Sequence, residues 1–407
     1  EKRKKGICII TWPSVRIEEF RVKYGVEPHA RILMQCHKNT GFHEFILRLF
    51  NKWKSQGRFF HFLASIPNRV ENMSRYRADI GGKLSIYFQC WAAHPSTSKE
   101  GKVSGRRIET TTSRTAEWTC VSRAASSLES DSHYRSDDHI ALLLVPTFLK
   151  LLLHIPLIRR FYSQVVTPKG IYEYTIARTR YIDAIFKETL AEGFEQILLF
   201  GAGFDTRALR FQTEAGNTKI FELDVPITQE AKLDQYAKRG LSIPANVEFI
   251  SIDFDKESLS EKLEEAGFGR GGRSLFVLEG LLMYLQPESV DETFKVIEEF
   301  AGEGSEVVFD YVRASVLRQV GSYYGEREIA KTVAKAGERW YFGIEEGELE
   351  PFLKKYGLRV SEHKDAHDLD RMYFTDASGE IVGRVNGTHC LVRAVKPATS
   401  QEYTTQM

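Results

Sequence analysis

The chain has 407 residues, of which 42% are hydrophobic and 27% charged, and its formal net charge at pH 7 is +1. This composition is that of a soluble globular protein, and the length is enough for one large core or two ordinary ones. The five cysteines show no CxxC pair and no metal-ligand spacing: Cys8, Cys36, Cys90, Cys120 and Cys390. They therefore exclude a disulfide framework and indicate a reducing compartment, and we expect no metal site.

The charge is divided unequally along the chain. Residues 1–107 carry 21 Lys+Arg against 8 Asp+Glu, whereas the remainder carries 35 against 47. We therefore predict a basic extension over residues 1–108, ending in a polar linker, and a domain with all the chemistry over residues 109–407. An extension without a catalytic role is the favoured interpretation. A nucleic-acid surface and an organelle address are the alternatives, although no RNA-binding motif supports the first.

A helical region precedes the expected sheet, with runs from residue 113, over about 138–153 and over about 169–191. Residues 140–158 are mostly apolar and near the length that spans a bilayer. However, Lys150 and His154 lie within this segment, and Pro146 and Pro156 interrupt it. Because charges are costly in a membrane and proline breaks helices, we expect two packed helices broken near Pro146, and no membrane span.

Strands and helices then alternate, which predicts a parallel, doubly wound α/β sheet of Rossmann-like type with seven strands. The expected strands are 196–200, 219–223, 247–250, 274–278, 305–310, 357–363 and 388–395. The expected helices between them are 205–213, 226–239, 258–266, 287–300 and 345–355. Residues 312–342 are predicted to form an inserted helical lid, and the last two strands are predicted to pair as a closing hairpin.

The first expected strand runs into the turn Gly201-Ala202-Gly203, and Asp224 ends the second strand 21 residues after Gly203. This is the layout of a nucleoside-binding unit, in which glycines let the ligand approach the backbone and a carboxylate accepts from ribose hydroxyls. Thr206 stands where the dinucleotide pattern has its third glycine. The turn therefore suits S-adenosylmethionine, which has no pyrophosphate, better than NAD.

Four motifs that follow one another along the chain support this interpretation: ARTRYID at 177–183, GAGFDTR at 201–207, FELDVP at 221–226 and LEGLLMYL at 278–285. Together they resemble the leucine carboxyl methyltransferase-like family of S-adenosylmethionine-dependent O-methyltransferases, from about residue 113 to about residue 396. The resemblance implies the class I methyltransferase fold with an antiparallel last strand. It also implies methyltransferase activity and S-adenosyl-L-methionine as the cofactor.

The resemblance also assigns cofactor-binding roles to individual residues. Arg178 would bind the cofactor's carboxylate, a task suited to a guanidinium, and Arg180 could share this task or lie on a surface face of the helix. Asp253 would accept from the adenine amino group, with Phe254 beside it, and Glu279 would lie near the amino group of the methionine part. Arg123 falls near the position of a further basic residue.

The residues themselves suggest the remaining assignments. Gly201 and Gly203 would line the turn beneath the ligand, and Asp224 would bind the ribose. Other polar residues have structural alternatives: Asp205 and Thr206 as helix caps, Arg207 as an ion-pair partner, and Glu222 as the partner of a cation.

The acceptor is expected to be a carboxyl or hydroxyl group of a small molecule. Tyr284 is the weak candidate for shaping its site, and no general base stands out among His139, His154, His363, His367 and His389. The Asn/Asp-Pro-Pro-Tyr motif of amino methyltransferases is absent, with Glu279-Gly280-Leu281-Leu282 in its place. A protein's C-terminal leucine is the alternative acceptor, and a non-catalytic nucleoside-binding or RNA-associated protein is the alternative class. We expect no nucleic-acid partner and a cytoplasmic location, with an organelle as the alternative.

Since every motif follows residue 108, removal of residues 1–108 is expected to leave a folded domain that binds S-adenosylmethionine. Circular dichroism and calorimetry on the truncated and full chains would measure this. Aggregation of the truncated chain would show instead that the extension belongs to the core.

Overall fold

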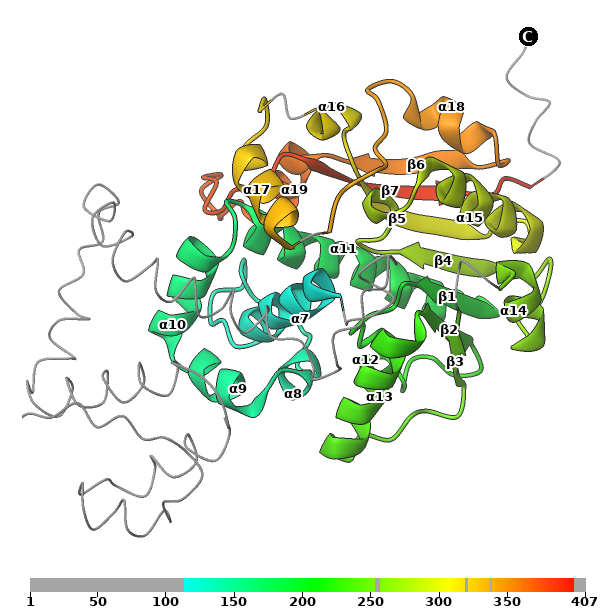
Figure 1. The fold of residues 1–407 in the computed structure, drawn as a ribbon, viewed down its shortest axis with the longest axis horizontal. Coiled ribbons are helices and arrows are strands. Elements are labelled where there is room, and N and C mark those ends of the chain that lie inside the picture. The colour runs from blue at the N-terminus through cyan, green and yellow to red at the C-terminus, as the bar shows by residue number, and fades with distance from the viewer. Residues whose placement is uncertain (1–112, 253–256, 319–320, 337, 399–407) are drawn as a thin grey trace, which may run out of the picture. The chain divides into compact units, whose positions relative to one another are not determined.

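The computed structural model describes residues 113–252, 257–318, 321–336 and 338–398. The predicted extension, residues 1–108, lies outside them and stays a prediction. In the described part, a seven-stranded sheet has the order β3-β2-β1-β4-β5-β7-β6 (Figure 1). Its strands are β1 (Gln196–Phe200), β2 (Lys219–Asp224), β3 (Val247–Ser251), β4 (Ser274–Leu278), β5 (Glu306–Val312), β6 (Arg359–Lys364) and β7 (His389–Val395).

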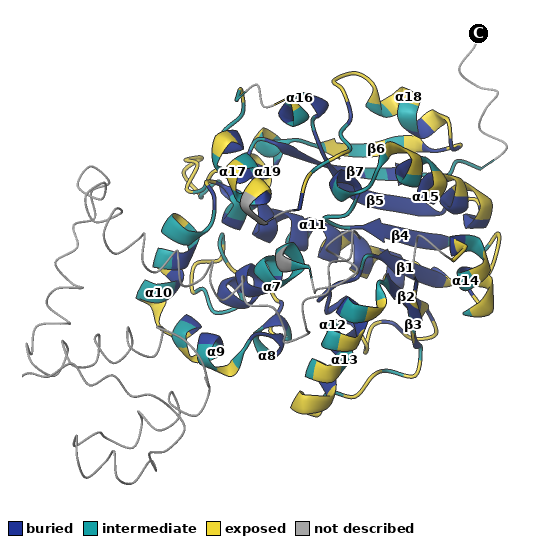
Figure 2. Cartoon of the chain, viewed as in Figure 1, coloured by how far each residue is buried: buried dark blue, intermediate teal, exposed yellow. Residues whose placement is uncertain are grey.

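The pairing of the strands confirms the predicted fold class. The first five strands are parallel, and β7 is antiparallel to both β5 and β6. The observed strand bounds differ from the expected ones by at most two residues. This agreement arises because the inner strands are continuous apolar runs, the pattern of strands that are covered on both faces. Every residue of β1, β4 and β5 is buried, as the dark central strands of Figure 2 show.

Alternate residues of β1 enter two different cores. Ile197 and Leu199 belong to the cluster that packs against α7 (Arg114–Ser126), α11 (Ile171–Ala191) and α13 (Pro226–Arg239). Leu198 and Phe200 belong to the cluster that packs against α14 (Leu259–Glu265), α15 (Pro287–Phe300) and α18 (Leu349–Lys354). Since successive side chains of a strand point to opposite faces, the sheet is the middle of three layers.

The apolar segment 140–158 forms three short helices, α8 (Ala141–Leu144), α9 (Thr147–Leu153) and α10 (Pro156–Phe161), followed by a π-helical turn over Tyr162–Val166. Pro146 precedes the first residue of α9, and Pro156 is the first residue of α10. The predicted break at Pro146 is therefore confirmed, and Pro156 adds a second one. Among the described residues, no helix is both long and apolar enough to cross a bilayer.

Three helices depart from the expectation. The helix expected over 345–355 is the shorter α18, which begins only at Leu349. The helix expected over 205–213 is only the single turn α12 (Arg207–Arg210), because Asp205 and Thr206 remain in the glycine-rich turn. Between β6 and β7 the chain forms the unpredicted helix α19 (Ala366–Tyr373), which begins with a capping box between Asp365 and Asp368. The predicted lid contains α16 (Ala314–Leu317) and α17 (Glu326–Ala336).

Phe276 tests the packing of the central strand. Its side chain is fully buried in β4, with its ring centroid 5.8 Å from that of Phe268. Phe276→Ala is expected to lower the free energy of unfolding by about 3–5 kcal/mol, since it removes the ring and leaves a cavity. Urea denaturation would measure the loss. Ile381→Ala is the control, because Ile381 is 54% exposed; an equal effect of the two changes would contradict the assigned core.

Candidate functional site

The strand register brings the key residues to one edge of the sheet. Phe200 is paired with Leu223 on one side and with Leu278 on the other, and Leu278 is paired with Phe309. The residues that follow these pairs, Gly201, Asp224, Glu279 and Asp310, therefore lie at the carboxyl ends of neighbouring strands. Ligands of doubly wound sheets bind at this edge, where the strand order reverses.

The glycine-rich turn is held by Asp224. Gly201 and Gly203 have positive φ values of 57° and 46°, a conformation that other residues rarely adopt. The backbone N–H of Gly203 donates to Asp224 Oδ2 at 2.5 Å, and the N–H of Val225 donates to Oδ1 at 2.7 Å. Burial raises the pKa of Asp224, and these two hydrogen bonds oppose the increase. Asp224 thus stands beside the turn, where the sequence predicted it.

Glu279 lies between two arginines. Its Oε1 is 3.0 Å from Arg178 Nε, and its Oε2 is 2.7 Å from Arg207 Nη1. Burial disfavours the ionised carboxylate, but Arg207 and Arg178 together hold the pKa of Glu279 below its ordinary value. Glu279 is therefore a carboxylate at the end of β4, fixed in orientation by cations on both sides.

Arg178 also contacts the end of β5. Its Nη1 donates to Asp310 Oδ2 at 2.8 Å, and the same oxygen accepts from the Tyr174 hydroxyl at 2.6 Å. Gly280 must be glycine here, since its φ is +63° and a Cβ would lie 3.1 Å from Arg178 Nη1. A guanidinium has five N–H donors, which is more than these two contacts use, so Arg178 could still bind a ligand.

Arg180 points elsewhere. Its Nη1 donates to the carbonyls of Ser132 and His133, and its guanidinium lies 4.8 Å from the Tyr373 ring centroid. Of the two arginines in the Ala-Arg-Thr-Arg motif, Arg178 is therefore the one at the sheet edge.

Arg207 is the centre of the site. It is fully buried, and it contacts Asp183 Oδ1 at 2.8 Å and Asp205 Oδ2 at 2.5 Å in addition to Glu279. Asp205 also accepts from the N–H of Arg207 at 2.7 Å, so its predicted capping role is confirmed. Although burial opposes ionisation, the charge of Arg207 holds the pKa of Asp205 well below its usual range.

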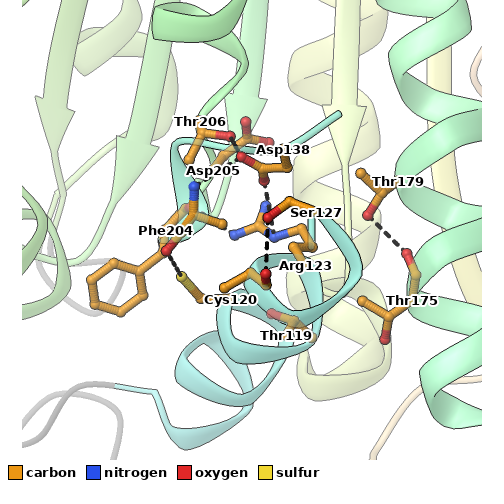
Figure 3. Close-up of polar contacts among 12 residues, drawn as sticks. Thr119, Cys120, Arg123, Ser127, Asp138, Thr175, Thr179, Phe204, Asp205 and Thr206 are labelled. Carbon is orange, nitrogen blue, oxygen red and sulfur yellow. Dashed lines mark hydrogen bonds and ion pairs between the residues drawn. The ribbon is translucent and has the colours of Figure 1, made fainter. Parts of the chain in front are cut away.

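The helical cap contributes a second group of charges (Figure 3). Arg123 of α7 donates to the Phe204 carbonyl at 2.7 Å, and its Nε is 3.5 Å from Asp138 Oδ2. The Thr206 hydroxyl donates to Asp138 Oδ1 at 2.7 Å, and Thr206 makes no side-chain helix cap. The alternative in which Thr206 caps the helix is therefore wrong, because the hydroxyl ties the turn to the cap instead.

The described residues of this network carry more negative than positive charge. Its carboxylates are Asp138, Asp183, Asp205, Glu279 and Asp310, and its cations are Arg123, Arg178, Arg207 and Arg210. Five carboxylates face four guanidiniums, so one negative charge is in excess. A buried excess of this sign favours a ligand with a net positive charge.

The sequence reasoning missed three of these carboxylates. Asp183 lies within the recognised ARTRYID motif, five residues after Arg178, and it binds Arg210 through two contacts of 2.6 and 2.8 Å. Asp310 lies on β5 and is the last residue of the strand expected over 305–310, a position that could have identified it. Nothing in the local sequence indicates Asp138, which lies in the cap.

Glu222 faces a cation rather than the glycine-rich turn. Its Oε2 is 2.5 Å from Lys232 Nζ, and both side chains are buried. Burial raises the pKa of Glu222 to about 7, although Lys232 opposes this shift. The alternative in which Glu222 pairs with a cation is therefore confirmed.

Of the remaining predicted residues, some lie outside the described part, whereas Tyr284 and His389 lie within it. Asp253 and Phe254 are not among the described residues, so their adenine-binding roles stay predictions. The Tyr284 hydroxyl lies 3.4 Å from Thr115 Oγ1. His389 is buried, which lowers its pKa to about 4 and keeps it neutral. In the described part of the chain, no group of three or more His, Cys, Asp or Glu side chains could hold a metal ion.

Arg207→Met tests the dependence of the fold on the buried cation. The change leaves Asp183, Asp205 and Glu279 without their shared partner, and we expect a loss of about 3–5 kcal/mol of unfolding free energy. Urea denaturation at pH 7 would measure it. Arg318→Met is the matched control, since the Arg318–Glu345 pair is exposed and should contribute little. Similar unfolding midpoints for the two variants would contradict the central role of Arg207.

Comparison with known proteins agrees with this geometry. The family model described as "Leucine carboxyl methyltransferase" matches residues 116–298. "Putative S-adenosyl-L-methionine-dependent methyltransferase YktD" of Bacillus subtilis is 27% identical over 206 residues, which are 51% of this chain and 67% of the relative. A protein of Mycobacteroides abscessus with the same general name is 35% identical over 147 residues, 36% of this chain and 48% of its own length.

Most of these matches span about half of the relative's length. Among solved structures, the crystal structure of "a putative methyltransferase from Thermobifida fusca" covers 68% of this chain and 94% of its own, with 17% identity and a TM-score of 0.43. The family match covers both the glycine-rich turn and Glu279. At residues 116–298 the chain therefore matches the model of the leucine carboxyl methyltransferase family.

Proposed function

We propose that this domain is an S-adenosylmethionine-dependent methyltransferase that transfers the methyl group to an oxygen atom of a small molecule. The observation that carries the proposal is the pair of carboxylates at the sheet edge. Asp224 ends β2 beside the glycine-rich turn, and Glu279 follows β4 on the other side of β1. The two could hold the ribose and the amino acid part of one nucleoside ligand.

The residues present fit S-adenosylmethionine. Its ribose offers hydroxyl donors to Asp224, and its amino acid part offers an ammonium to Glu279 and a carboxylate to Arg178. Its sulfonium and ammonium outnumber its carboxylate by one charge, which complements the negative excess of the network. When bound, the cofactor supplies an activated methyl group, and the protein's task is to orient that group and exclude water.

The chemistry at the end of β4 supports an oxygen acceptor. Glu279-Gly280-Leu281-Leu282 stands where amino methyltransferases carry an Asn/Asp-Pro-Pro-Tyr motif. The names of the relatives specify the cofactor and the reaction but no acceptor. A peptide with a C-terminal leucine therefore belongs in any acceptor panel, and tight cofactor binding without any transfer would favour a nucleoside-binding protein instead.

Asp224→Ala tests the cofactor site. The variant loses the carboxylate assigned to the ribose, and a hydrogen bond to a charged group contributes about 1.5–3 kcal/mol. We expect affinity for S-adenosylhomocysteine to fall at least about tenfold, measured by calorimetry, with the fold checked by circular dichroism.

Asp234→Ala is the matched control, because the Asp234 side chain is 70% exposed on α13. Unchanged affinity of a folded Asp224→Ala protein would refute the ribose assignment. Binding of NADH in place of the sulfonium nucleoside would refute the proposed function itself.

A further inference from the structure

The lid brings a buried carboxylate next to the end of β4. After α17 the chain runs beside the short helical turn Leu282–Tyr284, where the N–H of Tyr341 donates to the Met283 carbonyl at 2.8 Å. Glu338, three residues before Tyr341, is only 7% exposed. A carboxylate placed this deep needs hydrogen-bond donors.

Glu338 is linked to Tyr284 through Thr115. The Thr115 hydroxyl donates to Glu338 Oε2, and the Tyr284 hydroxyl donates to Thr115 Oγ1 at 3.4 Å. The three residues come from α7, from the turn after β4 and from the lid. Since they are far apart in the sequence, only the tertiary fold could create this row of two hydroxyls and a carboxylate.

A series of ring contacts joins this row to the charged network. The Arg178 guanidinium lies 5.3 Å from the Tyr174 ring centroid, and His389 stacks on Tyr174 at 4.4 Å. Trp340 of the lid meets His389 edge-on at 5.4 Å. Burial, and next the charge of Glu338, raise the pKa of Tyr284 to about 12, whereas its contact with Trp340 and the charge of Arg178 lower it. Tyr284 therefore keeps its proton at neutral pH and lies beside the Arg178 end of the site.

The direction of the hydrogen bonds limits what Tyr284 can bind. A carboxylate can only accept, so Thr115 must donate to Glu338, and the oxygen of Thr115 is then free to accept from Tyr284. The Tyr284 proton is directed at Thr115, so its oxygen can accept a hydrogen bond from a ligand but has no second proton to donate. A hydroxyl acceptor supplies the required O–H, whereas an ionised carboxylate does not.

We propose that Tyr284, Thr115 and Glu338 form a proton relay for a hydroxyl-bearing acceptor, so that this site methylates a hydroxyl group rather than a carboxylate. The inference rests on the proposed function and narrows its acceptor class. Tyr284 would touch the acceptor, and Thr115 and Glu338 would act through it.

The step balances without any further reactant. The acceptor oxygen forms a bond to the methyl carbon while the bond from that carbon to sulfur breaks, and its electron pair stays on the sulfur as a neutral thioether. The acceptor's proton passes to the Tyr284 oxygen, the Tyr284 proton to Thr115, and the Thr115 proton to Glu338. Glu338 ends as a neutral acid and releases its proton to water after the products leave.

Binding of small probes to the complex with S-adenosylhomocysteine tests the direction of the relay. We expect 4-methylphenol to bind at least about tenfold tighter than 4-methylbenzoate, and Tyr284→Phe to remove this preference. Tyr341→Phe is the matched control, since Tyr341 is 42% exposed in the same lid, and it should keep the preference. Equal binding of the two probes, no binding of either, or an unchanged preference in Tyr284→Phe would overturn the inference.

Transfer to 4-hydroxybenzoate, which carries both groups, tests the chemistry. The methyl ether is stable to alkali and the methyl ester is not, so labelled S-adenosylmethionine distinguishes them. We expect only the ether. Thr115→Val and Glu338→Gln should lower its rate about 10²–10⁴-fold, whereas Thr115→Ser, which keeps the hydroxyl, should restore it. An ester product, no labelled product at all, or equal rates for Thr115→Ser and Thr115→Val would contradict the relay.

The affinity for S-adenosylhomocysteine, measured on the same samples, separates this inference from the proposed function. Tight binding by all the variants with no preference for the phenol would refute only the relay. Failure of the unaltered protein to bind the nucleoside would refute the methyltransferase proposal.

Discussion

The structure depends on one buried cation. Arg207 is completely enclosed, and its guanidinium joins a carboxylate of α11, a carboxylate of the glycine-rich turn and the carboxylate that follows β4. None of these charges could remain buried alone, because the desolvation of an unpaired ion costs several kcal/mol. The pairing therefore fixes the helical cap, the turn and the central strands relative to one another.

The need to pair buried charges also explains why the proposed site is preorganised. Asp224 holds the backbone of Gly203, Arg207 and Arg178 hold Glu279, and Thr206 is anchored on Asp138. Groups that are already oriented lose little entropy when a ligand arrives, so the binding energy can be used to align the reacting atoms. A single excess negative charge then leaves the site complementary to a cationic nucleoside.

The two ends of the proposed site differ in their chemistry. At the Arg207 end, charged groups satisfy one another through short ion pairs. At the lid end, the Tyr284 hydroxyl meets the Thr115 hydroxyl, and the Thr115 hydroxyl meets the Glu338 carboxylate. Such a division suits a reaction that binds a charged donor in one place and handles a proton in another.

Several elements followed directly from the sequence. Continuous apolar runs such as residues 196–200 and 274–278 predicted the inner strands, since buried parallel strands need no polar face. Prolines at 146, 156, 226 and 287 set the beginnings of helices, because proline fits the N-terminal turn and disrupts a helix interior. The glycine-rich turn and Asp224 were also predicted, because their spacing is short and local.

The tertiary structure alone decided the partners of these residues. The network gains carboxylates from a cap loop, a helix and a strand: Asp138, Asp183 and Asp310. Thr115 likewise contacts Glu338, although the two residues are far apart in the sequence. The choice between Arg178 and Arg180 also depended on the fold, since the two lie on one helix and differ only in the face they present. Local pattern determines which residues form strands and turns. Which distant charges and hydroxyls meet depends on how the elements pack.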